Sequence, residues 1–296
     1  MKVPANLDWW RTVDGGEEWL ESLPAIVAAC AEQWSLTVGA PFADGNVSLA
    51  VPVERLSGEP AVLKVNFPEP ESEHEADALA HWGGQGAVRL LESDPSRRAL
   101  VVERCLPGDK LWTIADDEEA TRIAAEVLSR LSRSVSADSS FRPLALEAER
   151  WAFELERDWH ALGRPFERRV LGEALSACRE LGPEQGPAVL LHQDFHGGNV
   201  LQSERAAWLA IDPKPLLGER EFDAASLLRD RRWLLAEPGM SSVMRRRLDL
   251  LSEELRLDRE RMRRWGVVHA LAWGVSSRGV EADMVECARI LVDVGT

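Results

Sequence analysis

The first hundred residues switch between a helical and a strand-like spacing of apolar side chains. Residues 16–34 place apolar side chains three and four positions apart, which predicts an amphipathic helix. Residues 46–53 and 61–67 alternate at period two and predict two strands joined by a turn at 56–60. The same criteria predict a short helix over 69–82 and strands over 87–91 and 99–103. This order indicates a mostly antiparallel sheet with one helix before it and one inserted into it.

Beyond Pro107-Gly108 the spacing becomes mainly helical. Helix-periodic runs cover 117–134, 147–162, 167–181, 221–235, 242–255, 258–278 and 281–292, and strand-like runs cover 188–191, 199–201 and 207–211. We therefore expect an α+β fold of two lobes. The N-terminal lobe, residues 1–105, would hold a small antiparallel sheet, and the C-terminal lobe, residues 106–296, would be mainly helical, with a hinge near 102–108.

Composition limits the classes of protein to which the chain can belong. Hydrophobic residues make up 45% of the 296 residues and charged residues 29%, as in ordinary globular proteins. The net charge of −15 argues against a nucleic-acid binder, which usually carries a clustered basic surface. The acidity favours a cationic ligand, or it serves solubility alone.

Cysteine spacing and apolar run lengths bear on the compartment. Cys30, Cys105, Cys178 and Cys287 form no CxxC pair, which is typical of reduced thiols in a cytosolic chain. Residues 1–11 show no apolar stretch of the signal-peptide kind. No run approaches the ~20 apolar residues that span a bilayer. We therefore expect a cytoplasmic protein that binds neither membranes nor nucleic acid.

Residues 192–199 carry the strongest chemical signal. The pattern His192-x-Asp194-x4-Asn199 follows the apolar run 188–191, and the later strand 207–211 leads into Asp212. Phosphoryl transfer needs a carboxylate beside the attacking hydroxyl and oxygen ligands for magnesium. A tight hairpin between the two strands would bring these acid and amide side chains together. The segment therefore predicts transfer of the terminal phosphoryl group of a nucleoside triphosphate.

Two other interpretations of this segment remain open. It could be a polar surface loop in which His192 is an ordinary buried histidine. Alternatively, His192, Asp194 and His196 could form a metal cluster of a hydrolase, although zinc sites usually require three protein ligands and the other histidines show no paired spacing. A P-loop kinase is excluded because the chain contains no GxxxxGK[ST] sequence.

Lys64 lies in the middle of the apolar strand 61–67, where a lysine that faces a core needs an anionic partner. Together with Glu75 in the next helix and the segment 192–199, it resembles the aminoglycoside phosphotransferase superfamily, which shares the protein-kinase-like fold. The run 210–218, followed by Glu221-Phe222-Asp223, is similar to the streptomycin 6-kinase and hydroxyurea phosphotransferase branch. The resemblance covers about residues 38 to 235, with Gln193 at a position where the family commonly has glycine.

The resemblance implies a role for each matching residue. Lys64 would bind the α and β phosphates, and Glu75 would hold Lys64 in place. Asp194 would orient the substrate hydroxyl and accept its proton. Asn199 and Asp212 would ligate Mg²⁺. These implied roles agree with what phosphoryl transfer requires.

Further implied roles concern the support of the site and the nucleotide base. His192 would brace the catalytic loop, and Asp223 would accept backbone N–H bonds that fix it, or be an ordinary acid at a helix N-terminus. Residues 101–106, with Glu103 and Cys105, would form the hinge that reads the adenine edge through backbone groups.

Two more positions are candidates for ligand contact. Asn46 lies in the glycine-poor segment 39–46, which would cover the phosphates. Lys214 would contact the γ-phosphate or the acceptor, or it would close the turn after Asp212.

The resulting expectation is an ATP- and Mg²⁺-dependent kinase that phosphorylates a hydroxyl group of a small molecule, either cationic or neutral. Its branch of the superfamily points to an aminoglycoside-type antibiotic such as streptomycin. A metabolic kinase of the same fold acting on a sugar, amino sugar or cyclitol is the alternative, and a non-catalytic nucleotide-binding protein is a remote one. Acids of the helical lobe could receive cationic groups of the acceptor: Asp116, Asp117, Glu118, Glu147, Glu149, Glu154 and Glu281.

Overall fold

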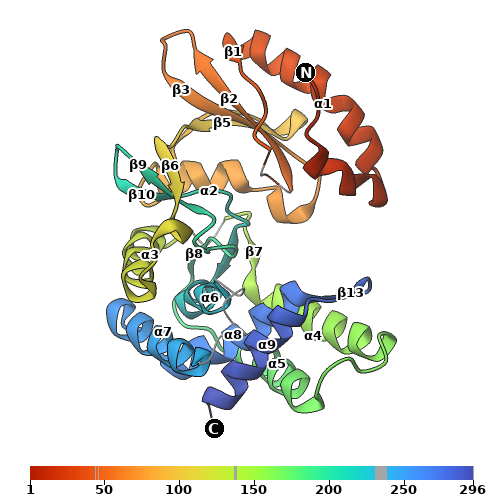
Figure 1. Cartoon of the computed structure of the whole chain (residues 1–296), viewed down its shortest axis with the longest axis vertical. Helices are drawn as coiled ribbons and strands as arrows, with labels where there is room; N and C mark the ends of the chain where they lie inside the picture. Colours follow the sequence, from red (N-terminus) through yellow and green to blue (C-terminus); the bar gives the residue numbers. More distant parts are fainter. Residues whose placement is uncertain (44, 46, 137–138, 231–238, 296) are drawn as a thin grey trace.

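The computed structural model describes residues 1–43, 45, 47–136, 139–230 and 239–295, and it places a five-stranded sheet above a body of helices (Figure 1). The sheet has the strand order β1-β2-β3-β5-β4, and every neighbouring pair is antiparallel. Its strands are β1 (Leu36–Val38), β2 (Ser48–Arg55), β3 (Pro60–Asn66), β4 (Leu90–Asp94) and β5 (Ala99–Glu103). The expected antiparallel sheet is therefore present.

Side chains alternate along each strand, so the two faces of this sheet contact different parts of the molecule. On one face Leu49, Leu63 and Val101 are buried in a core formed with the 3₁₀ helix η1 (Ala5–Thr12) and helix α1 (Gly16–Trp34). The register pairs Ala50 with Lys64 on the opposite face. That second face is directed toward the helical body, and the Lys64 side chain projects from it.

Short elements connect the sheet with the helical body. Between β3 and β4 lie the 3₁₀ helix η2 (Pro70–Ser72) and helix α2 (Glu75–Trp82), and the 3₁₀ helix η3 (Pro95–Arg97) precedes β5. Strand β6 (Pro107–Lys110) pairs with β9 (Val200–Ser203), which pairs with β10 (Ala207–Ala210). The connection between β5 and β6 spans residues 104–106, and we retain the division into lobes 1–105 and 106–296 as a proposal.

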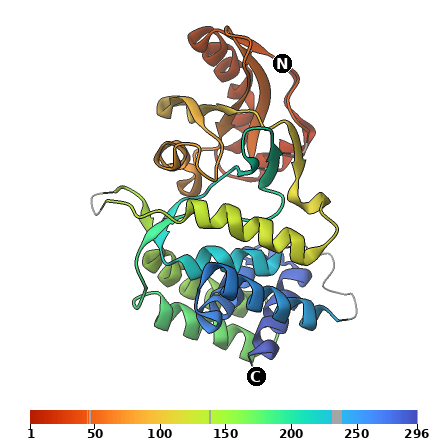
Figure 2. The same ribbon diagram turned by 90° about the vertical axis from the view of Figure 1, so that its left-hand side faces the viewer.

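The lower body consists mainly of helices that pack around one large core. Its helices are η4 (Leu111–Thr113), α3 (Asp117–Leu131), α4 (Leu144–Ala161), α5 (Arg168–Leu181), α6 (Arg220–Ser226), η5 (Leu227–Arg229), α7 (Met240–Leu255), α8 (Arg259–Gly274) and α9 (Ala282–Val294). A small sheet joins β7 (Arg142–Pro143), β11 (Leu216–Gly218) and β8 (Val189–Leu191). Helix α3 runs below the sheet part in Figure 2. Trp82 Nε1 donates a hydrogen bond to Leu131 O over 2.9 Å, which ties α2 to the end of α3.

Several expected boundaries differ from the structure. The helix expected over 258–278 ends at Gly274, and a two-stranded hairpin of β12 (Val275–Ser276) and β13 (Gly279–Val280) follows. The close approach of α8 and α9 explains the glycine, since a Cβ atom there would lie 2.3 Å from Met284 Cβ. The expected strand 87–91 begins only at Leu90, because Ala87 bridges to Ala210 instead.

Two expected helices are shorter than their apolar periodicity indicates. The run 69–82 forms a short 3₁₀ helix that starts at Pro70 and then α2 from Glu75, because proline has no N–H and favours a helix start. The run 221–235 forms α6 and η5 as far as Arg229, and residues 231–235 lie outside the described part of the chain.

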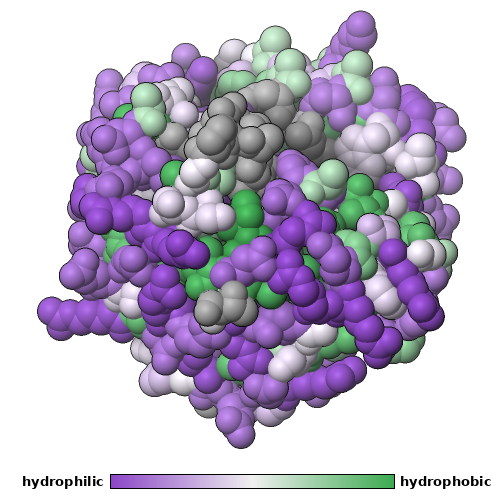
Figure 3. Space-filling model, turned by 60° about the horizontal axis from the view of Figure 1, so that its bottom comes forward, coloured by the Kyte–Doolittle hydropathy of each residue, from purple (hydrophilic) through white to green (hydrophobic). Residues whose placement is uncertain are grey.

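The surface agrees with the acidic, charged composition. Hydrophilic side chains cover most of the face shown in Figure 3, with hydrophobic patches between them. Among the described residues, no helix has both the length and the apolar character that crossing a bilayer requires.

The core face of β3 gives a stability prediction. Leu63 is fully buried, whereas Leu56 in the turn between β2 and β3 is 88% exposed. We expect Leu63→Ala to lower the free energy of unfolding by about 2–5 kcal/mol, because it removes buried methyl groups and leaves a cavity. Leu56→Ala, the matched control, should change it by less than about 0.5 kcal/mol. Urea denaturation followed by tryptophan fluorescence measures both, and equal losses would contradict the assignment of the core face.

Candidate active site

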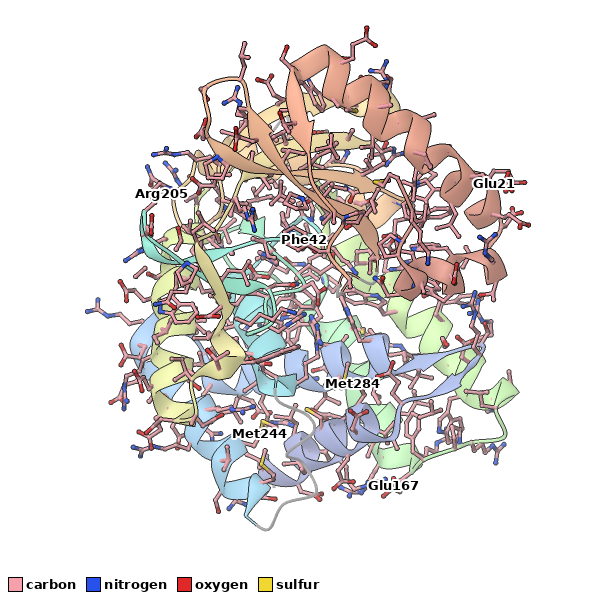
Figure 4. The ribbon with its side chains drawn as sticks, turned by 45° about the horizontal axis from the view of Figure 1, so that its top comes forward. Glu21, Phe42, Glu167, Arg205, Met244 and Met284 are labelled. Atoms are coloured by element: carbon pink, nitrogen blue, oxygen red, sulfur yellow. The ribbon has the colours of Figure 1, made fainter. Side chains whose placement is uncertain are left out.

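A cleft with a volume of about 480 Å³ lies between the second face of the sheet and the loops of the helical body. Cleft-facing strand residues include Ala50, Val62, Lys64 and Val102, and the opposite side includes Leu201 and Ile211. The described residues that line the rest of the cleft include Asp194, Asn199, Asp212, Lys214, Phe42 and Trp112. Phe42, labelled in Figure 4, lies in the segment that precedes β2. The cleft therefore has apolar walls at one end and acid, amide and lysine groups at the other.

The ammonium group of Lys64 joins the sheet to the helical part. It donates hydrogen bonds to Glu75 Oε1 over 2.7 Å, to Glu75 Oε2 over 2.8 Å and to Asp212 Oδ1 over 2.8 Å. Asn66 Nδ2 donates to the same Glu75 carboxylate over 2.7 Å. Burial alone would lower the pKa of Lys64, but the charges of Asp212 and Glu75 outweigh it and raise this pKa, so the ammonium stays charged.

The carboxylate of Asp194 faces several cationic groups. Arg229 Nη2 donates to its Oδ1 over 2.6 Å, and Lys214 Nζ lies 3.9 Å from its Oδ2. Burial opposes ionisation, yet Arg229, Lys214 and neighbouring histidines together hold the pKa of Asp194 below its usual range. The group is therefore an ionised carboxylate in the cleft.

One helical segment, α6 followed by η5, holds the loop 192–197 in place. Asp223 accepts the backbone N–H groups of His192 and Gln193, each over 2.7 Å. Ser226 Oγ donates to Phe195 O over 2.6 Å. Burial raises the pKa of Asp223 to about 7, although the two N–H bonds favour its charged form. Gln193 takes a φ of 67°, the left-handed region that favours glycine, and these bonds stabilise it there.

The same segment continues to contact the loop beyond Ser226. After Arg229, which binds Asp194, the carboxylate of Asp230 accepts the N–H of Gly197 over 2.8 Å. It also accepts a short hydrogen bond from Trp112 Nε1, and the Trp112 ring stacks on His196 with centroids 5.3 Å apart. Residues 223, 226 and 229 recur three positions apart in the helical segment, and Asp230 adds its contacts from an extended position directly after η5.

Asn199 and Asp212 provide oxygen atoms at the same end of the cleft. Asn199 Nδ2 donates to Asp194 O over 3.0 Å, so its amide oxygen is the atom that remains for a ligand. The Asp212 side chain is 46% exposed and uses Oδ1 for Lys64, which leaves Oδ2. Two such oxygens fit Mg²⁺, because proteins usually hold this ion through one or two side chains together with substrate phosphates.

The zinc interpretation of the histidine motif finds no support in the described residues. They contain no group of three or more His, Cys, Asp or Glu side chains that could hold a metal ion. His192 is fully buried, and its Nε2–H donates to Ile211 O over 2.9 Å. It therefore links the loop to the residue before Asp212.

The hinge residues lie at the apolar end of the cleft. The side chain of Glu103 is turned away to Arg205, whose Nε lies 2.9 Å from Glu103 Oε2. Arg205 lies after β9 at the outer edge of the molecule in Figure 4. Burial raises the pKa of Cys105 to about 12, so this thiol stays protonated. The Glu103 side chain is thus engaged away from the cleft, and its backbone N–H donates to Arg89 O over 3.0 Å. Asn46 lies outside the described residues.

The family model for aminoglycoside/hydroxyurea antibiotic resistance kinases matches residues 33–283 of this chain. The chain belongs to this family. It is 41% identical over 252 residues to a streptomycin 6-kinase of Streptomyces glaucescens, covering 84% of this chain and 81% of the relative. It is 38% identical over 283 residues to a hydroxyurea phosphotransferase of Kitasatospora aureofaciens, covering 93% and 81%. The expected family branch is confirmed, and so is the expectation of a kinase.

Solved structures of low sequence identity share the fold of this kinase. A ternary complex of a thermostable mutant of aminoglycoside phosphotransferase APH(4)-Ia with ADP and hygromycin B has a TM-score of 0.63 at 13% identity, covering 91% of this chain and 98% of that one. Choline kinase LicA from Streptococcus pneumoniae has a TM-score of 0.57 at 13% identity, covering 85% and 88%. The expected bilobal, protein-kinase-like fold is confirmed.

The structure brings together the predicted residues Lys64, Glu75, Asp194, Asn199 and Asp212 at one cleft. The sequence did not identify other residues that contact them. From the sequence, Arg229 and Asp230 are assigned only to the helical run 221–235, and His269 shows no paired spacing. A signal existed for the first two, since polar residues recur at helical spacing after Asp223 in an otherwise apolar run. No local pattern marks His269, because its partners lie 40 and 76 residues away in the sequence.

Two buried neutral histidines give the kinase a defined pH response. Burial lowers the pKa of His192 to about 4 and that of His269 to about 3, whereas an unfolded histidine has a pKa near 6.5. Below pH 6.5 the unfolded chain therefore binds protons that the folded chain does not bind. The stability contribution of each histidine is complete above this pH and is lost as the pH falls.

We test this with His269→Asn, which keeps an acceptor near Nδ1 but does not titrate. The difference in the free energy of unfolding, wild type minus variant, should fall by about 1.4 kcal/mol for each pH unit from pH 6.5 to pH 5. Denaturant titrations at each pH measure it. His160→Asn, a replacement at an exposed position, is the matched control. A flat difference for His269→Asn would contradict the neutral buried state.

Proposed function

We propose that this kinase transfers the γ-phosphoryl group of ATP to a hydroxyl group of an aminoglycoside-type antibiotic such as streptomycin. The observation that carries the proposal is the meeting of Lys64, Glu75 and Asp212 through one ammonium group, in the same cleft as Asp194. This set supplies a phosphate-binding cation and a carboxylate for the acceptor hydroxyl.

The nucleotide would lie with its base at the apolar end of the cleft. Ala50 and Val62 would pack above the base, and Leu201 and Ile211 would pack below it. Backbone groups of residues 103–105 would bind its edge. The phosphates would then reach Lys64, which its carboxylate partners hold in an extended, charged state.

At the other end of the cleft, Asp194 would accept the proton of the attacking hydroxyl as its oxygen bonds to the γ-phosphorus. The bond from the γ-phosphorus to the β-phosphate oxygen would break at the same time and release ADP. Asn199 and Asp212 would hold Mg²⁺ through their remaining oxygens, and Lys214 lies where it can reach the transferred phosphoryl group or the acceptor. When bound, Mg²⁺ would supply positive charge that offsets the negative charge of the phosphate oxygens.

The substrate class follows from the relatives rather than from the cleft. The streptomycin 6-kinase is 41% identical to this chain, which favours an aminoglycoside. The hydroxyurea phosphotransferase at 38% identity makes hydroxyurea a second candidate acceptor. We also propose a cytoplasmic location, where ATP is available, and the four free cysteine thiols fit a reducing compartment.

Replacement of the base tests the catalytic assignment. We expect Asp194→Ala to lower kcat with streptomycin and Mg-ATP by about 10²–10⁴-fold, because proton acceptance from the hydroxyl is lost. Its Kd for ATP should stay within about threefold of wild type. Asp249→Asn is the control, since this exposed aspartate forms an ion pair with Arg259 far from the cleft.

The assay should include streptomycin, other aminoglycosides, hydroxyurea, amino sugars and cyclitols as acceptors. Wild-type turnover of a cyclitol or amino sugar alone would favour a metabolic kinase instead. Undiminished turnover by Asp194→Ala with any acceptor would refute the role of this carboxylate.

Magnesium dependence tests Asn199 and Asp212. At fixed ATP, we expect Asn199→Ala and Asp212→Asn to raise the half-saturating Mg²⁺ concentration at least about tenfold, because each removes an oxygen ligand or its charge. EDTA should abolish activity in wild type. Asp249→Asn should keep the wild-type magnesium curve. If both ligand variants also kept it, the ion would have to bind elsewhere.

A further inference from the structure

Arg229 binds the side chain of Asp194 but is not among the described residues that line the cleft. It is only 5% exposed, at the end of η5, and its Nη2 atom donates to Asp194 Oδ1 over 2.6 Å. A buried arginine without this carboxylate would be costly, so the pair forms a fixed unit rather than a fluctuating surface contact.

The guanidinium of Arg229 is itself held on other sides. Its Nε–H donates to His269 Nδ1 over 2.9 Å, and its Cζ lies 5.5 Å from the centroid of the Trp273 ring. Because Nδ1 accepts this bond, the proton of neutral His269 resides on Nε2, which donates to Gln193 O over 2.8 Å. Trp273 also stacks on His269, with centroids 4.0 Å apart and planes 10° apart.

This arrangement distinguishes the two oxygens of Asp194. Oδ1 is used by Arg229, and His196 Nε2 lies 3.7 Å from it. Oδ2 has Lys214 Nζ at 3.9 Å, which is beyond hydrogen-bond distance. Among the described residues, Oδ2 is therefore the oxygen that remains for a hydroxyl group in the cleft.

We propose that Arg229, locked by His269 and Trp273, is a positioning residue that fixes the Asp194 carboxylate so that Oδ2 meets the acceptor hydroxyl. The inference rests on the proposed role of Asp194 as the base. Helix α8 contributes no residue to the cleft lining. Through the bond between His269 and Arg229, it nevertheless affects the geometry of the reacting group.

A chain of contacts supports positioning over simple burial of charge. Arg229 and His269 contact the same short loop at two adjacent residues, the side chain of Asp194 and the carbonyl of Gln193. A lysine, whose ammonium is a single point charge, could supply positive charge alone. The planar guanidinium of Arg229 instead makes two bonds in fixed directions, one to Asp194 and one to His269. Variants that keep the charge but lose the second bond can therefore separate the two explanations.

The first experiment compares Arg229→Met with Arg263→Met, using streptomycin and Mg-ATP. Arg263 is also 5% exposed, but its bonds go to Glu173, Glu260 and Leu291, away from the cleft. We expect Arg229→Met to lower kcat by about 10²-fold, as a misplaced reacting group does, with both KM values within about threefold. Arg263→Met should lower Tm without this selective loss of kcat. Equal effects of the two variants on kcat would overturn the proposal.

The second experiment uses the two conservative replacements of His269. The oxygen of Asn in His269→Asn can take the place of Nδ1 and accept from Arg229, whereas the amide of Gln in His269→Gln reaches the position of Nε2. We expect the asparagine variant to retain at least about tenfold more kcat than the glutamine variant. Arg229→Lys should fall between Arg229→Met and wild type. The reverse order of the histidine variants would contradict positioning through Nδ1.

A double variant separates failure of this inference from failure of the proposed function. If Arg229 acts through Asp194, adding Arg229→Met to Asp194→Ala should cause no further loss of kcat. A further loss of tenfold or more would overturn the inference. If Asp194→Ala alone kept wild-type turnover, the proposed function of Asp194 would fail first. Crystal structures of Arg229→Met and Arg263→Met add a readout without turnover, because only the first should displace the Asp194 carboxylate.

Discussion

The ammonium of Lys64 is the constraint on which the rest of the molecule depends. A lysine on an otherwise apolar, buried strand is tolerable only with anionic partners, and here they come from separate parts of the chain. Glu75 is eleven residues away and Asp212 is 148 residues away. Satisfying one buried charge thus brings α2 and the loop after β10 to the second face of the sheet. That contact creates the cleft with its charged end.

The loop 192–197 also needs buried polar partners, in this case for its backbone. Residues 192–197 form an irregular loop beneath the cleft, and a buried loop must find partners for its backbone groups. Asp223 and Ser226 of α6 supply them together with Asp230, which directly follows η5. Arg229, at the end of η5, adds a contact with the side chain of Asp194.

Much of this could be predicted because it is encoded locally. Helix α1 was expected over 16–34 and occupies Gly16–Trp34, since its apolar spacing and its limits are both visible in the sequence. Lys64 could be recognised because a charge interrupts a period-two apolar run. Other boundaries failed where tertiary contacts overrule local periodicity. Helix α8 ends at Gly274, where α9 packs so closely that a Cβ atom would clash with Met284, and Ala87 bridges to Ala210 instead of continuing the expected strand.

The sequence by itself determined the class of fold and the kinase reaction, because the apolar periodicity and the motif at 192–199 depend on residue type and short-range spacing. Its resemblance to a known family then supplied the candidates for the site residues. Only the tertiary structure decided how those residues are held. It showed that one oxygen of Asp194 accepts a hydrogen bond from Arg229, that His269 accepts another from this arginine, and that the Glu103 side chain turns away to Arg205. Such partners lie tens of residues apart, and no local pattern specifies them. They are fixed by the requirement that every buried charge and polar group finds a partner when the helices pack.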